Sequence, residues 1–162
     1  MARSAQTLEN SSSLFLDECP TNIANYHLIG GKCCFFSTQN IDYDAQQSLC
    51  ATKFKGGRLF EPRSLTASNE VSNAVAAESL GSTYYFIGIN DRISDNVLAY
   101  ESTGTPVSIT IPWQSGQPNY NGNINDCATV YASQKTWNMQ ACTVSDMAIC
   151  EEPLQSMDPS SH

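Results

Sequence analysis

Seven cysteines constrain the fold of this 162-residue chain more than any other feature. None of them forms a tight Cys-x-x-Cys pair beside a pair of histidines, so their spacing argues against a zinc site. The spacing favours a disulfide framework of three bridges, made in an oxidising compartment from six of the seven cysteines. The seventh then forms an intermolecular bridge or remains a free thiol, and we favour the bridge.

The composition predicts one folded domain. Hydrophobic residues make up 41% of the chain and charged residues 15%, which is too apolar for a disordered protein, and the length allows one core but not two. The net charge of -8 argues against a nucleic-acid partner and against docking on anionic lipid. No apolar run approaches the roughly 18 residues of a spanning helix, so we expect no membrane insertion.

The two ends of the chain are polar and rich in serine. We therefore expect a flexible N-terminal segment at residues 1–18, a domain at residues 19–152 and a C-terminal tail at residues 153–162. The first residues lack the apolar core of a secretory signal, so we expect a mature chain whose cysteines, rather than a leader, support secretion. Asn10 begins a glycosylation sequon, which is consistent with export.

Two helices are expected in the first half of the domain. Residues 45–55 follow an acidic start and end at Gly56, which is typical of a capped helix. A second helix is expected to begin at a Thr66 cap, to bury Val71 and its neighbours on one face, and to end at Gly81.

The second half of the domain is expected to form short antiparallel strands. Aromatic or β-branched runs alternate with turn residues at 84–89, 97–100, 128–131 and 147–150. A long polar segment, Thr103 to Asp126, separates the second run from the third, and a loop of this length in a small domain is usually functional. Helices followed by a small antiparallel sheet define an α+β domain.

Six motifs in this order resemble those of the C-type lectin domain, over residues 19–152. They are Gly57-Arg58-Leu59, Phe86-Ile87-Gly88-Ile89, Trp113-Gln114-Ser115-Gly116-Gln117-Pro118-Asn119, Asn125-Asp126-Cys127, Trp137-Asn138 and Ile149-Cys150-Glu151. The resemblance implies a C-type lectin fold of the long form, with two helices, small antiparallel sheets and a long polar loop.

The resemblance also implies a pairing for the cysteines. Three intrachain disulfides are expected, Cys50 with Cys150, Cys127 with Cys142 and Cys19 with Cys33. Cys34 is left over and stands where the family usually has an aromatic residue, and similar proteins use a cysteine in this area to join two subunits. We expect a disulfide-linked dimer of identical or related chains; the alternatives are a buried free thiol and a swapped pairing of Cys33 and Cys34 with Cys19.

In the family, the long loop binds a calcium ion, and the sugar binds that ion directly. The matching positions here are Gln117, Asn119, Asn125, Asn138 and Met139, and none of them holds a carboxylate. Calcium affinity follows the number of carboxylate ligands, and a thioether is a poor ligand for calcium. We expect weak or absent calcium binding at this principal site.

The loop is nevertheless expected to bind sugar. Its amides, with Asp126, would make a neutral patch rich in donors and acceptors, suited to galactose or N-acetylated hexosamines. The family peptide bond before Pro118 is cis and turns the flanking side chains toward one centre. The expected sugar-binding residues are Gln117, Asn119, Tyr120, Asn125, Asp126 and Asn138, with Tyr131 as a further stacking ring. The alternative is that these asparagines satisfy only the backbone of turns.

A second calcium position of the family, auxiliary to sugar binding, maps on Asp91, Asp95, Asn125 and Asp126, with Tyr120 in place of an acid. The three remaining carboxylates suffice for a loosely held ion. The alternative is that these acids are solvated turn residues.

The function class is expected to be binding and not catalysis. The only histidines are His27 and the terminal His162, and no nucleophile motif is present; His27 is expected to be a surface or packing residue. We expect a secreted lectin that binds glycans of cells or microbes, plausibly in innate defence. The alternative function is a lectin-like domain that binds protein or mineral instead of sugar.

Overall fold

The computed structural model describes residues 19–20, 22–78 and 84–153. The expected flexible N-terminal segment, the sequon at Asn10, the helix end at Gly81 and the tail from residue 154 lie outside these described residues. Within them, neither helix has the length and apolar character needed to cross a bilayer.

One mixed sheet forms the centre of the described domain. Its strands are β1 (Tyr26–Ile29), β2 (Lys32–Ile41), β8 (Asp146–Glu151), β4 (Tyr84–Asn90), β6 (Cys127–Tyr131) and β7 (Thr136–Gln140), side by side in that order. Two short strands extend it, since β3 (Arg58–Leu59) pairs with β8 and β5 (Ala99–Tyr100) with β4. The expectation of purely antiparallel sheets was wrong at one place, because β4 and β8 run parallel. The sequence between them is long enough for the crossover that a parallel pair needs.

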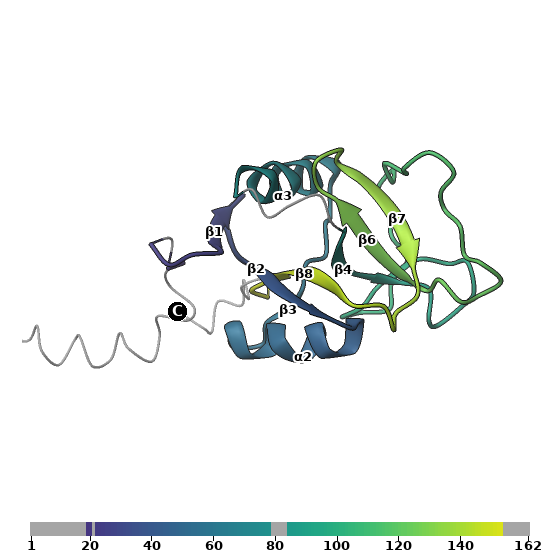
Figure 1. Ribbon diagram of the computed structural model, residues 1–162, viewed down its shortest axis with the longest axis horizontal. Helices are drawn as coiled ribbons and strands as arrows, with labels where there is room; N and C mark the ends of the chain where they lie inside the picture. Colours follow the sequence, from purple (N-terminus) through teal and green to yellow (C-terminus); the bar gives the residue numbers. More distant parts are fainter. Residues whose placement is uncertain (1–18, 21, 79–83, 154–162) are drawn as a thin grey trace, which may run out of the picture.

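Helix α2 (Tyr43–Lys53) lies against β2, β3 and β8, and helix α3 (Leu65–Ala77) covers the other side of the sheet (Figure 1). Asp42 caps α2 by accepting a hydrogen bond from the Ala45 amide at 2.8 Å. The expected Thr66 cap of α3 was wrong. Ser64 has the extended backbone of an N-cap and accepts from the Ala67 amide at 3.0 Å, so the helix begins two residues earlier than expected.

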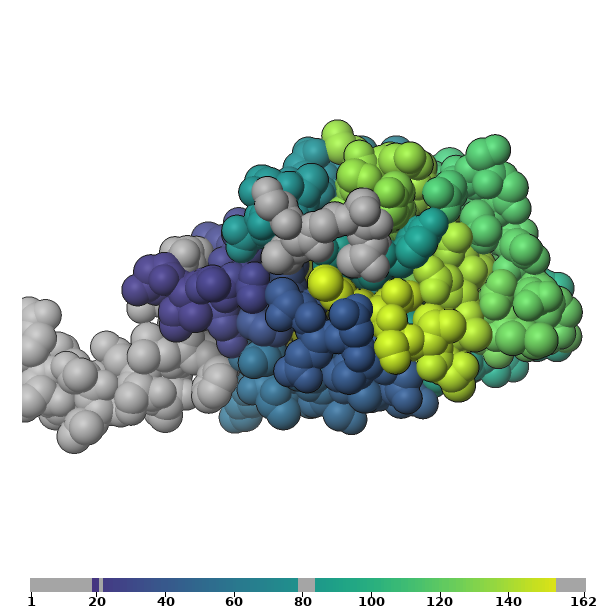
Figure 2. Space-filling model, in the orientation of Figure 1, coloured from purple at the N-terminus to yellow at the C-terminus, as the bar shows by residue number. Residues whose placement is uncertain are grey.

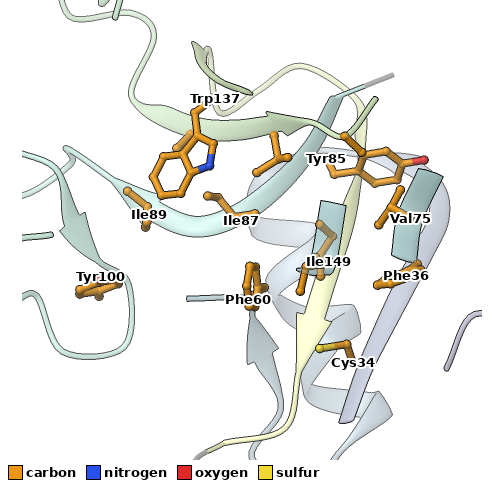
Figure 3. Packing of buried hydrophobic residues seen from close by; sticks show 14 of the residues in the cluster. Cys34, Phe36, Phe60, Val75, Tyr85, Ile87, Ile89, Tyr100, Trp137 and Ile149 are labelled. Atoms are coloured by element: carbon orange, nitrogen blue, oxygen red, sulfur yellow. The ribbon is translucent and has the colours of Figure 1, made fainter. Parts of the chain in front are cut away.

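The core occupies both faces of the sheet. On the α3 side, Trp137, Tyr85, Ile87 and Ile149 are almost fully buried, and the Trp137 indole donates to the Ser68 hydroxyl at 3.1 Å (Figure 3). On the α2 side, Phe86, Leu59 and Tyr43 pack around the half-cystines of the largest disulfide loop. Trp137 is therefore a core residue.

The three expected disulfides are present, Cys19–Cys33, Cys50–Cys150 and Cys127–Cys142. The expected intersubunit bridge at Cys34 stays a prediction, and the burial of this residue argues against it. Cys34 lies on the interior strand β2 with 1% of its surface exposed, in the core cluster that also contains Phe36 and Ile149 (Figure 3). Burial raises the pKa of its thiol, which suppresses the reactive thiolate. Of the alternatives, the buried free thiol is the one that the structure supports.

Two buried carboxylates connect the sheet to the start of the long segment. Glu151 accepts from the Lys32 ammonium at 3.0 Å and from the Arg58 guanidinium at 2.9 Å. Glu61 accepts from the Arg63 guanidinium at 2.8 Å and from the amide and hydroxyl of Ser102, each at 2.8 Å. The position at which the chain leaves the body is therefore fixed by charged hydrogen bonds.

Beyond Ser102 the chain runs through the long segment and returns at β6. The segment forms one end of the molecule, next to β7 and opposite the end that carries β1 (Figures 1 and 2). Val107, Ile109 and Ile111 pack against the core, whereas the alternate positions Ser108 and Thr110 are exposed. This alternation of buried and exposed side chains holds the segment on the body. The segment joins the sheet only through two isolated β-bridges, one between Pro106 and Ala99 and one between Trp113 and Trp137.

Candidate functional site

Gln117 anchors the candidate site to the sheet. The bond between Gln117 and Pro118 is cis, as expected. The Gln117 side-chain oxygen accepts from two backbone amides, that of Asn119 at 2.9 Å and that of Met139 on β7 at 3.0 Å. Two N–H donors fix the orientation of the amide, so its Nε2 group faces away from them.

Asn119 and Asn125 close the tip of the loop on itself. The Asn119 side-chain oxygen accepts from the Asn121 amide at 3.0 Å, and the Asn125 Nδ2 donates to the Asn119 carbonyl at 3.0 Å. Asn121, Gly122 and Asn123 all have positive φ, which asparagine and glycine tolerate best. Within the described part of the chain, the Asn119 Nδ2 and the Asn125 Oδ1 have no protein partner and remain available to a ligand.

Asn138 lies on β7, and both its side-chain oxygen and its side-chain nitrogen already bond to the protein. Its Oδ1 accepts from the Thr129 hydroxyl at 3.3 Å, and its Nδ2 donates to Gln114 Oε1 at 3.3 Å. The four predicted amides are thus brought to one region, because Gln117 bonds to the residue that follows Asn138. Gln117, Asn119 and Asn125 each give one group to the backbone and keep another free, so their role in the turn does not use all of their hydrogen-bonding groups.

These residues do not fit a calcium ion. The principal site contains no carboxylate, and the Gln117 and Asn138 side-chain oxygens are occupied by protein donors. Met139, which stands at a family ligand position, is 2% exposed and belongs to the core. A cation needing six to eight oxygens would have to break these hydrogen bonds first.

Asp91 and Asp126 lie together beneath the loop. The Asp91 amide donates to the Asp126 carbonyl at 3.0 Å, and Asp91 Oδ2 accepts from the Asn96 amide at 2.8 Å. Among the described residues, the Oδ1 atoms of both acids are buried without a hydrogen-bond partner. Burial and the neighbouring Asp126 raise the pKa of Asp91. Asp126 therefore pairs with Asp91, and its buried Oδ1 does not belong to the exposed amide patch.

The auxiliary calcium position is only partly assembled. Asp95 lies in the exposed turn at residues 92–97, and within the described ranges no three acidic, cysteine or histidine side chains gather as a metal site. Two carboxylates alone are a weak ligand set for calcium. The predicted trio of Asp91, Asp95 and Asp126 is reduced to a pair.

The two tyrosines predicted to contact the sugar, Tyr120 and Tyr131, have different surroundings. Tyr120 is half-buried against the core, and burial together with nearby Asp91 raises the pKa of its hydroxyl. Tyr131 pairs with Tyr84, with ring centroids 5.0 Å apart. His27 is a packing residue, as expected: it stacks on Phe36 and its Nε2 lies 2.7 Å from the Glu78 carboxylate.

Sequence reasoning missed two features of this site. The first is the absence of any charged residue between positions 102 and 125, in a chain with sixteen acidic and eight basic residues. A scan of charge along the sequence would have found it. The second is Gln114, whose Oε1 accepts from Asn138 and, at 3.4 Å, from the Tyr84 hydroxyl. Nothing in the sequence distinguishes this glutamine from its neighbours.

Known proteins resemble this chain in both sequence and fold. C-type lectin domain family 4 member E of Homo sapiens is 26% identical over 137 residues, which cover 82% of this chain and 58% of that protein. Pulmonary surfactant-associated protein D of Sus scrofa is 32% identical over 111 residues, covering 67% of this chain and 27% of that protein. The chain thus spans about half or less of the length of these relatives.

Solved structures share the architecture. The C-type lectin CEL-I from Cucumaria echinata superposes with a TM-score of 0.71 at 17% identity, over 83% of this chain and 97% of that one. A calcium-independent type II antifreeze protein superposes with a TM-score of 0.64 at 22% identity, over 80% of this chain and 92% of that one. The sequence profile of the Lectin C-type domain matches residues 39–152. The chain therefore belongs to the C-type lectin domain family.

Proposed function

We propose that this protein is a lectin that binds neutral glycans through the loop from Gln117 to Asn138, with little or no dependence on calcium. The observation that carries the proposal is the uncharged surface of residues 102–125, in a chain of net charge -8. A neutral ligand rich in hydroxyls fits such a surface better than an ionic one, because it places no unpaired charge against it. Membership of the family makes the chain a binding domain and not an enzyme.

The free amide groups define the chemistry of the ligand. Gln117 and Asn119 offer N–H donors, and Asn125 offers an acceptor oxygen. A sugar hydroxyl both donates and accepts, and an acetamido carbonyl accepts from such donors. This pattern supports galactose or an N-acetylhexosamine as the bound residue. Asn138 acts indirectly in this account, by holding Gln114 and the adjoining strand in place.

The cellular setting follows from the covalent structure and the relatives. Three disulfides require an oxidising compartment, so the proposed location is secreted and extracellular. One relative is named as a pulmonary surfactant-associated protein. The proposed partners are glycans of cell or microbial surfaces, with a role in innate defence.

Retention on immobilised galactose and immobilised N-acetylgalactosamine tests the site. Asn119→Ala and Asn125→Ala should each weaken retention about tenfold, because each removes a hydrogen bond from a desolvated contact. Ser108→Ala is the matched control, since it removes an exposed polar group from the same segment without touching the site. Unchanged retention in both asparagine variants would move the site elsewhere.

A second function is favoured by the hydrogen bonds that the amides already make. The side-chain oxygens of Gln117, Asn119 and Asn138 all serve the protein, as they would in a loop with a purely structural role. Such a domain would bind a protein or a mineral surface instead of sugar. Absence of saccharide binding, together with capture of a protein ligand that depends on the exposed loop, would favour this alternative.

A further inference from the structure

A pair of tyrosines lies on the sheet beside the candidate site. Tyr84 on β4 is directly opposite Tyr131 on β6, and Tyr131 is opposite Thr136 on β7. The Tyr84 and Tyr131 rings are 5.0 Å apart and inclined by 38°. Both side chains are only half-buried, which leaves part of this aromatic pair open to a ligand.

Side-chain alternation explains why the pair is not covered. Tyr84 and Tyr131 occupy the same face of the sheet as Phe86 and Thr129, which is the face on which α2 packs. Helix α2, however, lies mainly against β2, β3 and β8 at the other end of the sheet (Figure 1). Among the described residues, no helix therefore covers this face of β6 and β7.

Gln114 connects the aromatic pair to the candidate sugar site. Its Oε1 accepts from the Tyr84 hydroxyl at 3.4 Å and from Asn138 Nδ2 at 3.3 Å. Its backbone is also fixed at both ends, because its amide donates to the Trp137 carbonyl and its carbonyl accepts from the Gln117 amide, each at 2.9 Å. Asn138 and Thr136 are two residues apart on β7, about 7 Å along the strand. Gln114 therefore links the aromatic pair to the residues of the candidate site.

We propose that Tyr84 and Tyr131 form a second subsite, which receives the next sugar residue of an oligosaccharide bound at the loop. This inference rests on the proposed lectin function. An aromatic ring can stack on the apolar face of a sugar, while neighbouring neutral polar groups bind its hydroxyls. The Gln114 Nε2 supplies a donor here, whereas the Thr136 hydroxyl is buried and does not face the ligand. The chemistry selects a neutral oligosaccharide over a single sugar.

Calorimetric titration with N-acetyllactosamine, and separately with galactose and N-acetylglucosamine, tests the subsite. The wild-type protein should bind the disaccharide about fivefold more tightly than the better of the two monosaccharides, the gain expected of one aromatic contact. Tyr131→Ala should abolish this gain. It should leave the affinity for the monosaccharide unchanged, because the Tyr131 ring pairs with Tyr84 and not, as expected from the sequence, with the loop amides. Tyr131→Phe should keep the gain, because it keeps the ring.

Two further variants separate binding from folding. Tyr131→Leu keeps apolar bulk without the ring and should lose the gain even if Tyr131→Ala proves unstable. Tyr26→Ala is the matched control, because Tyr26 is also half-buried and pairs with a ring, Phe35 at 4.9 Å, but lies on β1 at the far edge of the sheet. It should leave both affinities unchanged.

The outcomes distinguish this subsite from the proposed function. Equal affinity of the wild-type protein for disaccharide and monosaccharide would overturn the subsite while the lectin function stands. The same holds if Tyr131→Leu keeps the disaccharide gain. If none of the three saccharides binds and a wider glycan screen is also negative, the lectin function fails and the subsite fails with it.

Discussion

The body of this domain and its long segment accommodate polar groups in opposite ways. The body around β8 buries full charges, with Glu151 completely enclosed and paired with Lys32 and Arg58. The long segment from residue 102 to residue 125 has no charge, and its amides fold back on their own backbone. The body is therefore held by interactions that fail severely when one partner is lost, whereas the loop is held by many small ones.

This difference shows where ligand specificity can reside. A buried ion pair fixes geometry but has no group left for a ligand. A neutral amide can give its oxygen to the protein and still present its N–H₂ to solvent, as Gln117 and Asn119 do. The loop thus combines a fixed shape with free hydrogen-bonding groups, which is what recognition of hydroxyls requires.

Glu151→Ala should have the largest effect on stability, because it removes the buried acceptor at the centre of the body. It leaves Lys32 and Arg58 without their buried partner and removes the acceptor of the Glu61 amide. We expect a loss of about 3 to 5 kcal/mol in the free energy of unfolding, measured by urea denaturation. Asp44→Ala, which breaks the exposed pair with Arg92, should cost less than about 1 kcal/mol. Similar losses of stability in the two variants would show that the buried charges of the body matter no more than an exposed ion pair.

Asp146 is the exception within the body, because its buried Oδ2 has no partner among the described residues. Burial raises its pKa from 3.8 to about 6. The folded protein then binds an extra proton between these values, so this group's stability contribution is present below pH 3.8 and is lost as the pH rises through about 6.

Asp146→Asn should therefore be about 2 kcal/mol more stable than the wild-type protein near pH 7.5, and roughly equal to it near pH 4. Urea denaturation of both proteins at the two pH values measures this difference. Asp44→Asn, at an exposed site, should show no comparable dependence. A pH-independent difference for Asp146→Asn would refute the effect of burial on this carboxyl.

Within the loop, Gln117 and Asn119 should behave differently. Gln117→Ala removes the acceptor of two backbone amides, one of them on β7, and should cost about 1 to 2 kcal/mol of stability. Asn119→Ala removes one exposed turn contact and should cost no more than about 0.5 kcal/mol. Thermal unfolding measures both. The Asn119 variant is thus the cleaner probe of sugar binding, and equal costs would show that Gln117 is not the anchor.

The smallest effect is expected at Cys34. Because it is buried in the core, Cys34→Ala should leave the molecular mass on a non-reducing gel unchanged and cost about 1 kcal/mol of stability. A thiol reagent should label the native wild-type protein only after denaturant is added. A dimer that is lost specifically in this variant would restore the intersubunit bridge.

The sequence predicted the features that depend on local patterns. Asp42 and the glycines after α2 located the first helix, and short aromatic or β-branched runs between turn residues located β4 and β6. The residue pattern alone did not predict strand β2, because an interior strand buries both faces and most residues of its end, from Ser37 to Ile41, are polar. Neighbouring cysteines in that strand point to opposite faces, so sequence alone could not tell which one meets a partner.

The site was predicted less completely, since its decisive contacts are long-range. The family motif located Gln117, Asn119, Asn125 and Asn138, but it could not show which of their atoms serve the backbone. The bridging role of Gln114 joins residues far apart in the sequence and was not predicted, whereas the family resemblance did bring Asp91 and Asp126 together. Asp95 is close to Asp91 in the sequence, yet among the described residues its side chain does not form a cluster with Asp91 and Asp126.

The central claim is that an uncharged loop recognises glycans without calcium. A glycan array probed with the wild-type protein, once with calcium and once with a chelator, tests it most directly. We predict the same set of bound glycans, with similar intensities, under both conditions. Binding that disappears on chelation would contradict the claim, and would show that calcium is held despite the missing carboxylates.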